Sequence, residues 1–129
     1  LQTNTEIVYS IDEHNQLSGN VQVRSITGND INTLPYIAPF QGSIRWDRTW
    51  TDKFSSQLST TYIGVRSTGN TSMPQLEGYV DVSLRATYSL TNAMQCYVRI
   101  DNMTNSNIFV WEGYKERGIF FAAGVLWNF

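Results

Sequence analysis

An unbroken alternation of apolar and polar side chains runs through Val80-Asp-Val-Ser-Leu-Arg-Ala-Thr-Tyr-Ser-Leu90. The even positions are apolar or aromatic, and the odd positions carry aspartate, arginine, serine and threonine. Successive side chains of a β-strand point to opposite faces of a sheet, so a period of two predicts a strand. We therefore expect residues 79–90 to form a strand with one apolar and one polar face.

The same period of two recurs along the rest of the chain, clearly in residues 94–100 and 119–129 and more weakly before residue 66. It predicts seven strands, at residues 3–11, 17–26, 39–50, 54–66, 79–90, 94–102 and 118–129. No helical period competes with it, and neither an internal repeat nor a low-complexity linker interrupts it. The sequence predicts an all-β fold in one domain.

Composition narrows the functional classes. The 129 residues include nine Lys and Arg against eleven Asp and Glu, so there is no basic excess and no nucleic-acid partner is expected. A single cysteine, Cys96, and a single histidine, His14, exclude an internal disulfide and predict no metal site and no cofactor. No nucleophile can be placed beside a base, so the sequence predicts no catalytic residues and no enzyme.

Membrane signals of the helical kind are missing from the sequence. The longest apolar run, from Gly118 to Trp127, has ten residues, whereas a membrane-spanning helix needs about 20. The first residues, Leu1-Gln-Thr-Asn-Thr-Glu6, lack the basic and apolar regions of a signal peptide. We expect either that a signal has been removed or that the chain is a piece of a longer protein.

The connections between the predicted strands alternate in length. Short ones fall at residues 12–15, 51–53 and 91–93, and long ones at 27–38, 67–78 and 103–117. In an up-and-down antiparallel sheet, alternate connections lie at the same end, so all short turns share one rim and all long loops the other. This asymmetry is typical of outer-membrane β-barrels, and strands of about 9–11 residues are long enough to span.

The two predicted faces also suit a membrane barrel. Aromatic residues gather on the apolar face near the short turns, as in an interfacial girdle: Tyr9, Trp50, Phe54, Tyr88, Trp127 and Phe129. Arg48 interrupts this face beside Trp50 and could extend to lipid head groups. The opposite face is typical of a wet lumen, with Glu6, Gln22, Arg24, Arg45, Asp47, Asp81, Arg85, Gln95, Arg99 and Asp101. Four of these residues are expected to form cross-strand ion pairs: Asp81, Arg85, Arg99 and Asp101.

Alternation alone leaves a second interpretation open. A soluble or periplasmic β-barrel or sandwich that binds a ligand has the same pattern, with its apolar face turned inward. An outer-membrane enzyme is a third alternative. The rhythm of loop lengths and the aromatic rim favour the membrane interpretation.

Four segments resemble the C-terminal barrel end of TonB-dependent outer-membrane receptors. They are Leu34-Pro-Tyr-Ile-Ala-Pro39, Gly78-Tyr-Val-Asp-Val-Ser-Leu-Arg-Ala-Thr-Tyr88, Tyr97-Val-Arg-Ile-Asp-Asn-Met-Thr-Asn105 and Glu116-Arg-Gly-Ile-Phe-Phe-Ala-Ala-Gly-Val-Leu-Trp-Asn-Phe129. The resemblance implies that residues 1–129 are the C-terminal segment of such a barrel, without the plug domain. Seven strands are too few for the family's plugged 22-stranded barrel.

The resemblance also implies a function and partners. It implies an iron and siderophore transport receptor in the bacterial outer membrane, in contact with membrane lipid. The parent receptor would take up a scarce nutrient chelate and engage the TonB complex through an N-terminal region absent from this chain. Phe129 corresponds to the family's terminal assembly signal.

Two further expectations concern the loops and the edges. The long connection at residues 107–117 combines aromatics with cations, so it is our candidate contact for an anionic, ring-bearing chelate: Phe109, Trp111, Tyr114, Lys115 and Arg117. Alternatively, these aromatics pack the loop against its neighbours. The strands at 3–11 and 118–129 are expected to be sheet edges through which the isolated fragment self-associates.

Overall fold

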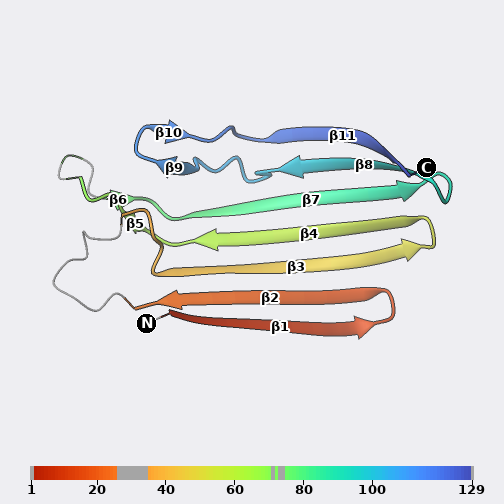
Figure 1. Cartoon of the computed structure of the whole chain (residues 1–129), viewed down its shortest axis with the longest axis horizontal. Helices are drawn as coiled ribbons and strands as arrows, with labels where there is room; N and C mark the ends of the chain where they lie inside the picture. Colours follow the sequence, from red (N-terminus) through yellow and green to blue (C-terminus); the bar gives the residue numbers. More distant parts are fainter. Residues whose placement is uncertain (1, 26–34, 71, 73–74, 129) are drawn as a thin grey trace.

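The computed structural model describes residues 2–25, 35–70, 72 and 75–128. Seven long strands form one antiparallel sheet in which each strand pairs with its neighbours in chain order (Figure 1). In order across the sheet they are β1 (Gln2–Asp12), β2 (Asn15–Arg24), β3 (Phe40–Thr51), β4 (Phe54–Ile63), β7 (Tyr79–Ser89), β8 (Met94–Asp101) and β11 (Phe120–Trp127). The predicted all-β, antiparallel up-and-down arrangement is confirmed.

The two ends of the sheet differ as the connection lengths predict. The short turns after β1, β3 and β7 lie together at one end, here called the short-turn rim, and the long connections lie at the other, the loop end (Figure 1). Asp12 closes the first turn by accepting hydrogen bonds from Asn15 Nδ2 and from the His14 backbone N–H, each 2.8 Å long. These two donors hold the pKa of the Asp12 carboxyl below its usual range.

The register sorts the side chains of the seven strands onto two faces. Leu58 lies opposite Leu84, which lies opposite Ile100, and the positions aligned with these three define the apolar face. Gln57 lies opposite Arg85, which lies opposite Arg99, and the positions aligned with these define the polar face. One face therefore collects the apolar half of each alternating strand and the other the polar half.

The expected strand at residues 54–66 ends earlier than its sequence pattern suggests. β4 stops at Ile63, and the last contact with β3 follows at Gly64, whose backbone N–H donates to the Phe40 carbonyl over 3.0 Å. A Cβ at Gly64 would lie 2.9 Å from that oxygen, so the close approach requires glycine. The prediction of a strand through residue 66 was wrong at this end.

Two small hairpins lie within the long connections, which the sequence had suggested were loops. β5 (Arg66–Ser67) pairs with β6 (Gln75–Leu76), and β9 (Phe109–Trp111) pairs with β10 (Tyr114–Lys115). Both extend from the loop end (Figure 1). Strands of two or three residues are too short to show a period of two, which explains why the pattern did not predict them.

The sheet has no packed layer on either face among the described residues. The buried hydrophobic side chains among the described residues are Ala38, Leu76 and Ile108, and all three belong to the connections at the loop end. On the apolar face, by contrast, Ile44 is 59% exposed and Phe121 68% exposed. A soluble sandwich buries one face of each sheet against another layer, and this arrangement does not. The described part of the chain also contains no helix that is long and apolar enough to span a membrane.

Candidate functional site at the polar face and the loop end

The polar face carries a row of hydrogen-bonding side chains that crosses the sheet. The register places Gln16, Asp47, Gln57, Arg85 and Arg99 side by side on five successive strands. Gln57 Nε2 donates to Asp47 Oδ1 over 2.7 Å, which links two of these strands through their side chains. Such a wall offers many donors and acceptors to water or to a polar neighbour.

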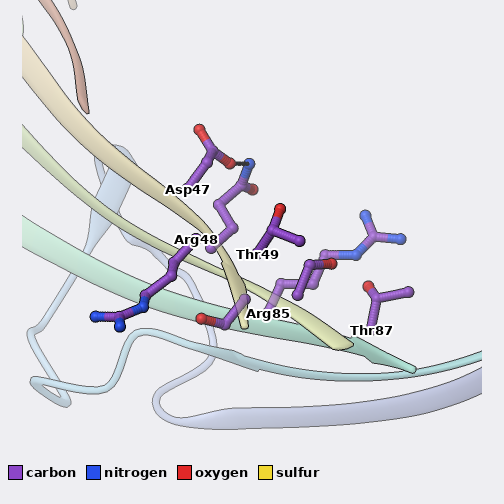
Figure 2. A pocket seen from close by; sticks show the side chains of 8 residues that line it. Asp47, Arg48, Thr49, Arg85 and Thr87 are labelled. Carbon is purple, nitrogen blue, oxygen red and sulfur yellow. Dashed lines mark hydrogen bonds between the residues drawn. The ribbon is translucent and has the colours of Figure 1, made fainter. Parts of the chain in front are cut away.

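A shallow hollow lies on this face near the short-turn rim. It has a volume of about 250 Å³ and is lined by residues of β3, β4 and β7: Asp47, Arg48, Thr49, Ser55, Ser56, Gln57, Arg85 and Thr87. Figure 2 shows Asp47, Thr49, Arg85 and Thr87 around it, with Arg48 directed away from them. The hollow is open and lined by both a carboxylate and a guanidinium, so it suits solvent better than an enclosed ligand.

The charges on the polar face pair along strands rather than across them. Arg45 Nε forms an ion pair with Asp47 Oδ2 at 2.9 Å within β3, and Arg99 Nε forms one with Asp101 Oδ2 at 3.0 Å within β8. The expected cross-strand pairing was wrong because the register sets Arg85 directly opposite Arg99, another cation. Arg85 instead lies over the Tyr97 ring, 5.1 Å from its centroid.

Arg66 joins the connections at the loop end. Its side chain is buried, Nη2 donates to the Phe109 carbonyl over 2.6 Å, and the guanidinium lies 5.4 Å from the centroid of the Tyr79 ring. Asn70 reaches the same hairpin by donating to the Glu112 carboxylate at 2.9 Å. The β9–β10 hairpin is thus held by the connection that contains β5. Sequence reasoning did not identify Arg66, because an arginine in a loop is usually exposed.

The candidate ligand residues all lie on or next to the β9–β10 hairpin. Trp111 meets Tyr36 edge to face, with 4.9 Å between ring centroids, and Arg117 covers the Phe120 ring at 3.7 Å. Tyr114 is 69% exposed, and Lys115 is exposed beside it. Phe109 is half-buried. The loop is therefore partly packed, as the alternative interpretation has it, while Tyr114 and Lys115 remain open for contact.

Asn102 also stabilises the backbone at the loop end, and the sequence did not predict this role. It is 4% exposed, adopts a positive φ of 50°, and exchanges two 2.9 Å hydrogen bonds with the Ser106 backbone. Its own N–H donates to Asp81 Oδ1 over 3.1 Å. Asparagine tolerates this left-handed conformation better than most residues, so it suits the position where β8 ends and the long connection begins.

Aromatic side chains mark the short-turn rim of the apolar face, as expected. Trp50 is 49% exposed, Trp127 62%, and Tyr9 and Tyr88 are also exposed, while Phe54 is half-buried beneath Trp50. Phe129, the candidate assembly signal, lies outside the described residues. A ring of amphipathic aromatics at one level is typical of a membrane interface.

The titratable and nucleophilic residues do not assemble into a reactive centre within the described ranges. His14 is exposed in the first turn and Cys96 is half-buried on the apolar face. No three His, Cys, Asp or Glu side chains of the described residues are grouped closely enough to hold a metal ion.

Comparisons with known proteins give a clear result at the level of structure alone. No protein-family model matches the chain, and neither does any curated protein. Among solved structures, a variant of the ferric enterobactin receptor PfeA from Pseudomonas aeruginosa matches with a TM-score of 0.81 and 17% identity, over 98% of this chain and 22% of that one.

Two further solved structures agree with it. A PfeA variant in complex with enterobactin matches with a TM-score of 0.79 and 18% identity, over 96% of this chain and 22% of that chain. The ferric-catecholate import receptor Fiu from E. coli K12, in its open form, matches with a TM-score of 0.80 and 17% identity, over 98% of this chain and 20% of that chain.

These matches define the fold. The seven-stranded sheet has the fold of the barrel part of TonB-dependent receptors, and the resemblance drawn from the sequence is confirmed at that level. The chain spans about a fifth of the length of the receptors that it matches.

Proposed function

We propose that this chain is the C-terminal segment of the barrel of a TonB-dependent receptor that imports an iron–siderophore complex across the bacterial outer membrane. One observation carries the proposal: a seven-stranded sheet with the fold of ferric enterobactin and ferric-catecholate receptors leaves its apolar face uncovered. Lipid on that face would remove the exposed apolar side chains from water without a second protein layer.

The polar face then lines the lumen. Its row of glutamine, arginine and aspartate side chains would contact water and the plug domain, which lies outside this chain. The TonB complex would act through an N-terminal region of the parent receptor and not through the seven strands of this sheet.

The loop end supplies the proposed ligand contacts. On and beside the β9–β10 hairpin, Trp111, Tyr114, Lys115 and Arg117 are exposed, and Phe109 is half-buried. A ferric catecholate is anionic and carries aromatic rings, so cation and ring contacts from such a hairpin would suit it. The similar receptors are a ferric enterobactin receptor and a ferric-catecholate import receptor, which supports this class of ligand.

Cysteine labelling across β7 tests the orientation of the two faces. In a Cys96→Ser background, Asp81→Cys, Ser83→Cys and Arg85→Cys should react with a polar thiol reagent in the membrane-embedded protein. Val82→Cys and Leu84→Cys should be protected, because their side chains share the apolar face. Reactive 82 and 84 with protected 81, 83 and 85 would support the soluble alternative instead.

A further inference from the structure

Arg48 is the only cation at the apolar-face positions of the seven described strands. It lies on β3, opposite Asn15 on one side and Ser56 on the other, close to the short-turn rim. Figure 2 shows it directed away from Asp47 and Arg85, which belong to the polar face. A cation on an apolar face is costly unless something pairs with it.

The aromatic neighbours of Arg48 hold its guanidinium in place. The guanidinium carbon lies 3.9 Å from the centroid of the Trp50 ring and 5.9 Å from that of Trp46. Trp50 is itself fixed, because its Nε1 donates to Ser56 Oγ over 2.9 Å and its ring stacks on Phe54 at 6.5 Å. Stacking of this kind orients the guanidinium fork but uses none of its N–H donors.

The hydrogen-bonding capacity of Arg48 is not met within the described part of the protein. Its Nε is buried and has no hydrogen-bond partner there, and no carboxylate forms an ion pair with the side chain. Neither polar neighbour forms a hydrogen bond with it: Asn15 Nδ2 donates to Asp12, and Ser56 Oγ accepts from Trp50. The guanidinium therefore lacks an anion.

The surroundings indicate which anion would fit. Arg48 lies at the level of the exposed rim aromatics, where phospholipid head groups meet the hydrocarbon of a bilayer. Toward the loop end, the apolar face continues with Ile44, which is exposed and would lie along an acyl chain. Guanidinium binds phosphate through paired N–H donors. A phospholipid would supply both a phosphate for the guanidinium and acyl chains for the apolar face, whereas a free phosphate would supply only the first.

We propose that Arg48, stacked on Trp50 and flanked by Trp46, binds the phosphate of a phospholipid head group in the leaflet at the short-turn rim. This site lies on the outer surface, on the other side of the sheet from the lumen and away from the ligand loops. The inference rests on the proposed function in one respect, namely that the apolar face meets lipid.

The test uses the receptor polypeptide that contains this chain, purified in a maltoside detergent. Lipid retention is followed by native mass spectrometry during titration with phosphatidylglycerol, with diacylglycerol of the same acyl chains, and with inorganic phosphate. Phosphatidylglycerol should be retained in preference to both of the others. Arg48→Gln should weaken its binding roughly fivefold, the usual effect of one basic side chain near a membrane surface. Arg45→Gln, on the same strand but the opposite face, should not.

Each contrary result has a definite meaning. Equal retention of diacylglycerol and phosphatidylglycerol by the unaltered protein would overturn the proposal without any variant, so a folding defect in Arg48→Gln cannot obscure it. Equal loss in Arg48→Gln and Arg45→Gln would also overturn it, and tight binding of inorganic phosphate would rule out a lipid-specific site.

A separate readout tests the orientation on which the proposal rests. Phospholipids with brominated acyl chains should quench the fluorescence of the rim tryptophans. Quenching without preference for phosphate would leave the proposed function standing and refute the lipid site. Absence of quenching would show that the apolar face does not meet lipid and would overturn the proposed function as well.

Discussion

Single residues that break the period of two carry the most specific information about this sheet. Arg66 is an example, because it is a buried cation that follows a strand and fixes the backbone of another connection. A buried hydrogen bond from a charged donor contributes about 1.5–3 kcal/mol. The hairpin that holds the candidate ligand residues is therefore stabilised by a side chain that makes no ligand contact in our proposal.

Replacement of Arg66 should loosen the β9–β10 hairpin. In Arg66→Met, trypsin should cleave after Lys115 and Arg117 roughly tenfold faster, since about 1.4 kcal/mol of local stability corresponds to a factor of ten. If the parent receptor binds a ferric catecholate as proposed, that binding should weaken as well. Arg85→Met, which changes an exposed polar-face arginine, is the matched control. Unchanged cleavage in Arg66→Met would show that the hairpin does not depend on this contact.

At the scale of elements, the strand ends are set by close backbone approaches. A Cβ at Gly78, just before β7, would lie 2.8 Å from the Ile63 carbonyl oxygen at the end of β4. That oxygen belongs to the backbone and cannot rotate away, so one of the two strands must shift. At Gly19, in the middle of β2, the nearest atom would be 3.8 Å away, which is ordinary contact.

The two glycines should therefore respond in opposite ways to alanine. Gly78→Ala should lower the free energy of unfolding by about 1–3 kcal/mol, the usual cost of overpacking. Gly19→Ala should leave it unchanged or raise it by up to about 1 kcal/mol, because alanine is more restricted in the unfolded chain. Urea titration of the protein folded in detergent measures both. A larger loss in Gly19→Ala would contradict this explanation of the strand end.

A second prediction at this scale concerns the last strand, β11. β11 places Phe121 and Val125 on the apolar face in register with Ile100 and Cys96, and Phe129 continues that spacing in the sequence. If Phe129 is the assembly signal, deleting it should reduce the amount of the parent receptor in the outer membrane while synthesis continues. Membrane fractions probed by immunoblot measure this, and wild-type amounts after the deletion would refute it.

At the scale of the whole molecule, the sheet is open at both sides. β1 and β11 are its edges, as the sequence predicted, and β1 is exposed along its whole length. β11 carries no charge or proline that would discourage pairing with another strand. Unpaired edges and a bare apolar face both favour association with another copy or with detergent.

The isolated 129 residues should therefore not be monodisperse in water. We expect oligomers or dependence on detergent in sedimentation velocity experiments, and a shift toward smaller species when detergent is added. Charged substitutions on β11, such as Val125→Lys, should reduce association more than the same change at exposed Thr51, the last residue of β3. A monodisperse monomer with cooperative unfolding would mean that one closed domain buries the apolar face, as in the soluble alternative.

The candidate ligand residues show which features of the site a local sequence pattern predicts and which it does not. Aromatics and cations within residues 107–117 identified this segment as a candidate ligand contact, because composition can be read without coordinates. Their partners were not predictable: Trp111 meets Tyr36, 75 positions earlier in the chain, and Phe109 is held by Arg66. Such contacts depend on where separate loops come together in the fold, and no local sequence pattern encodes that.

The sequence by itself determined the class of fold, the seven long strands, their two faces and the segregation of short turns from long loops. It could do so because a period of two is a property of each strand alone, and neighbouring strands in chain order pair directly. Only the tertiary structure decided the register, which sets Arg85 against Arg99, so that Arg99 pairs with Asp101 on its own strand and Arg85 lies over the Tyr97 ring. It also decided that Arg48 stacks on Trp50 and that Arg66 is buried. Register and loop convergence arise from contacts between segments far apart in the chain, and no single segment encodes them.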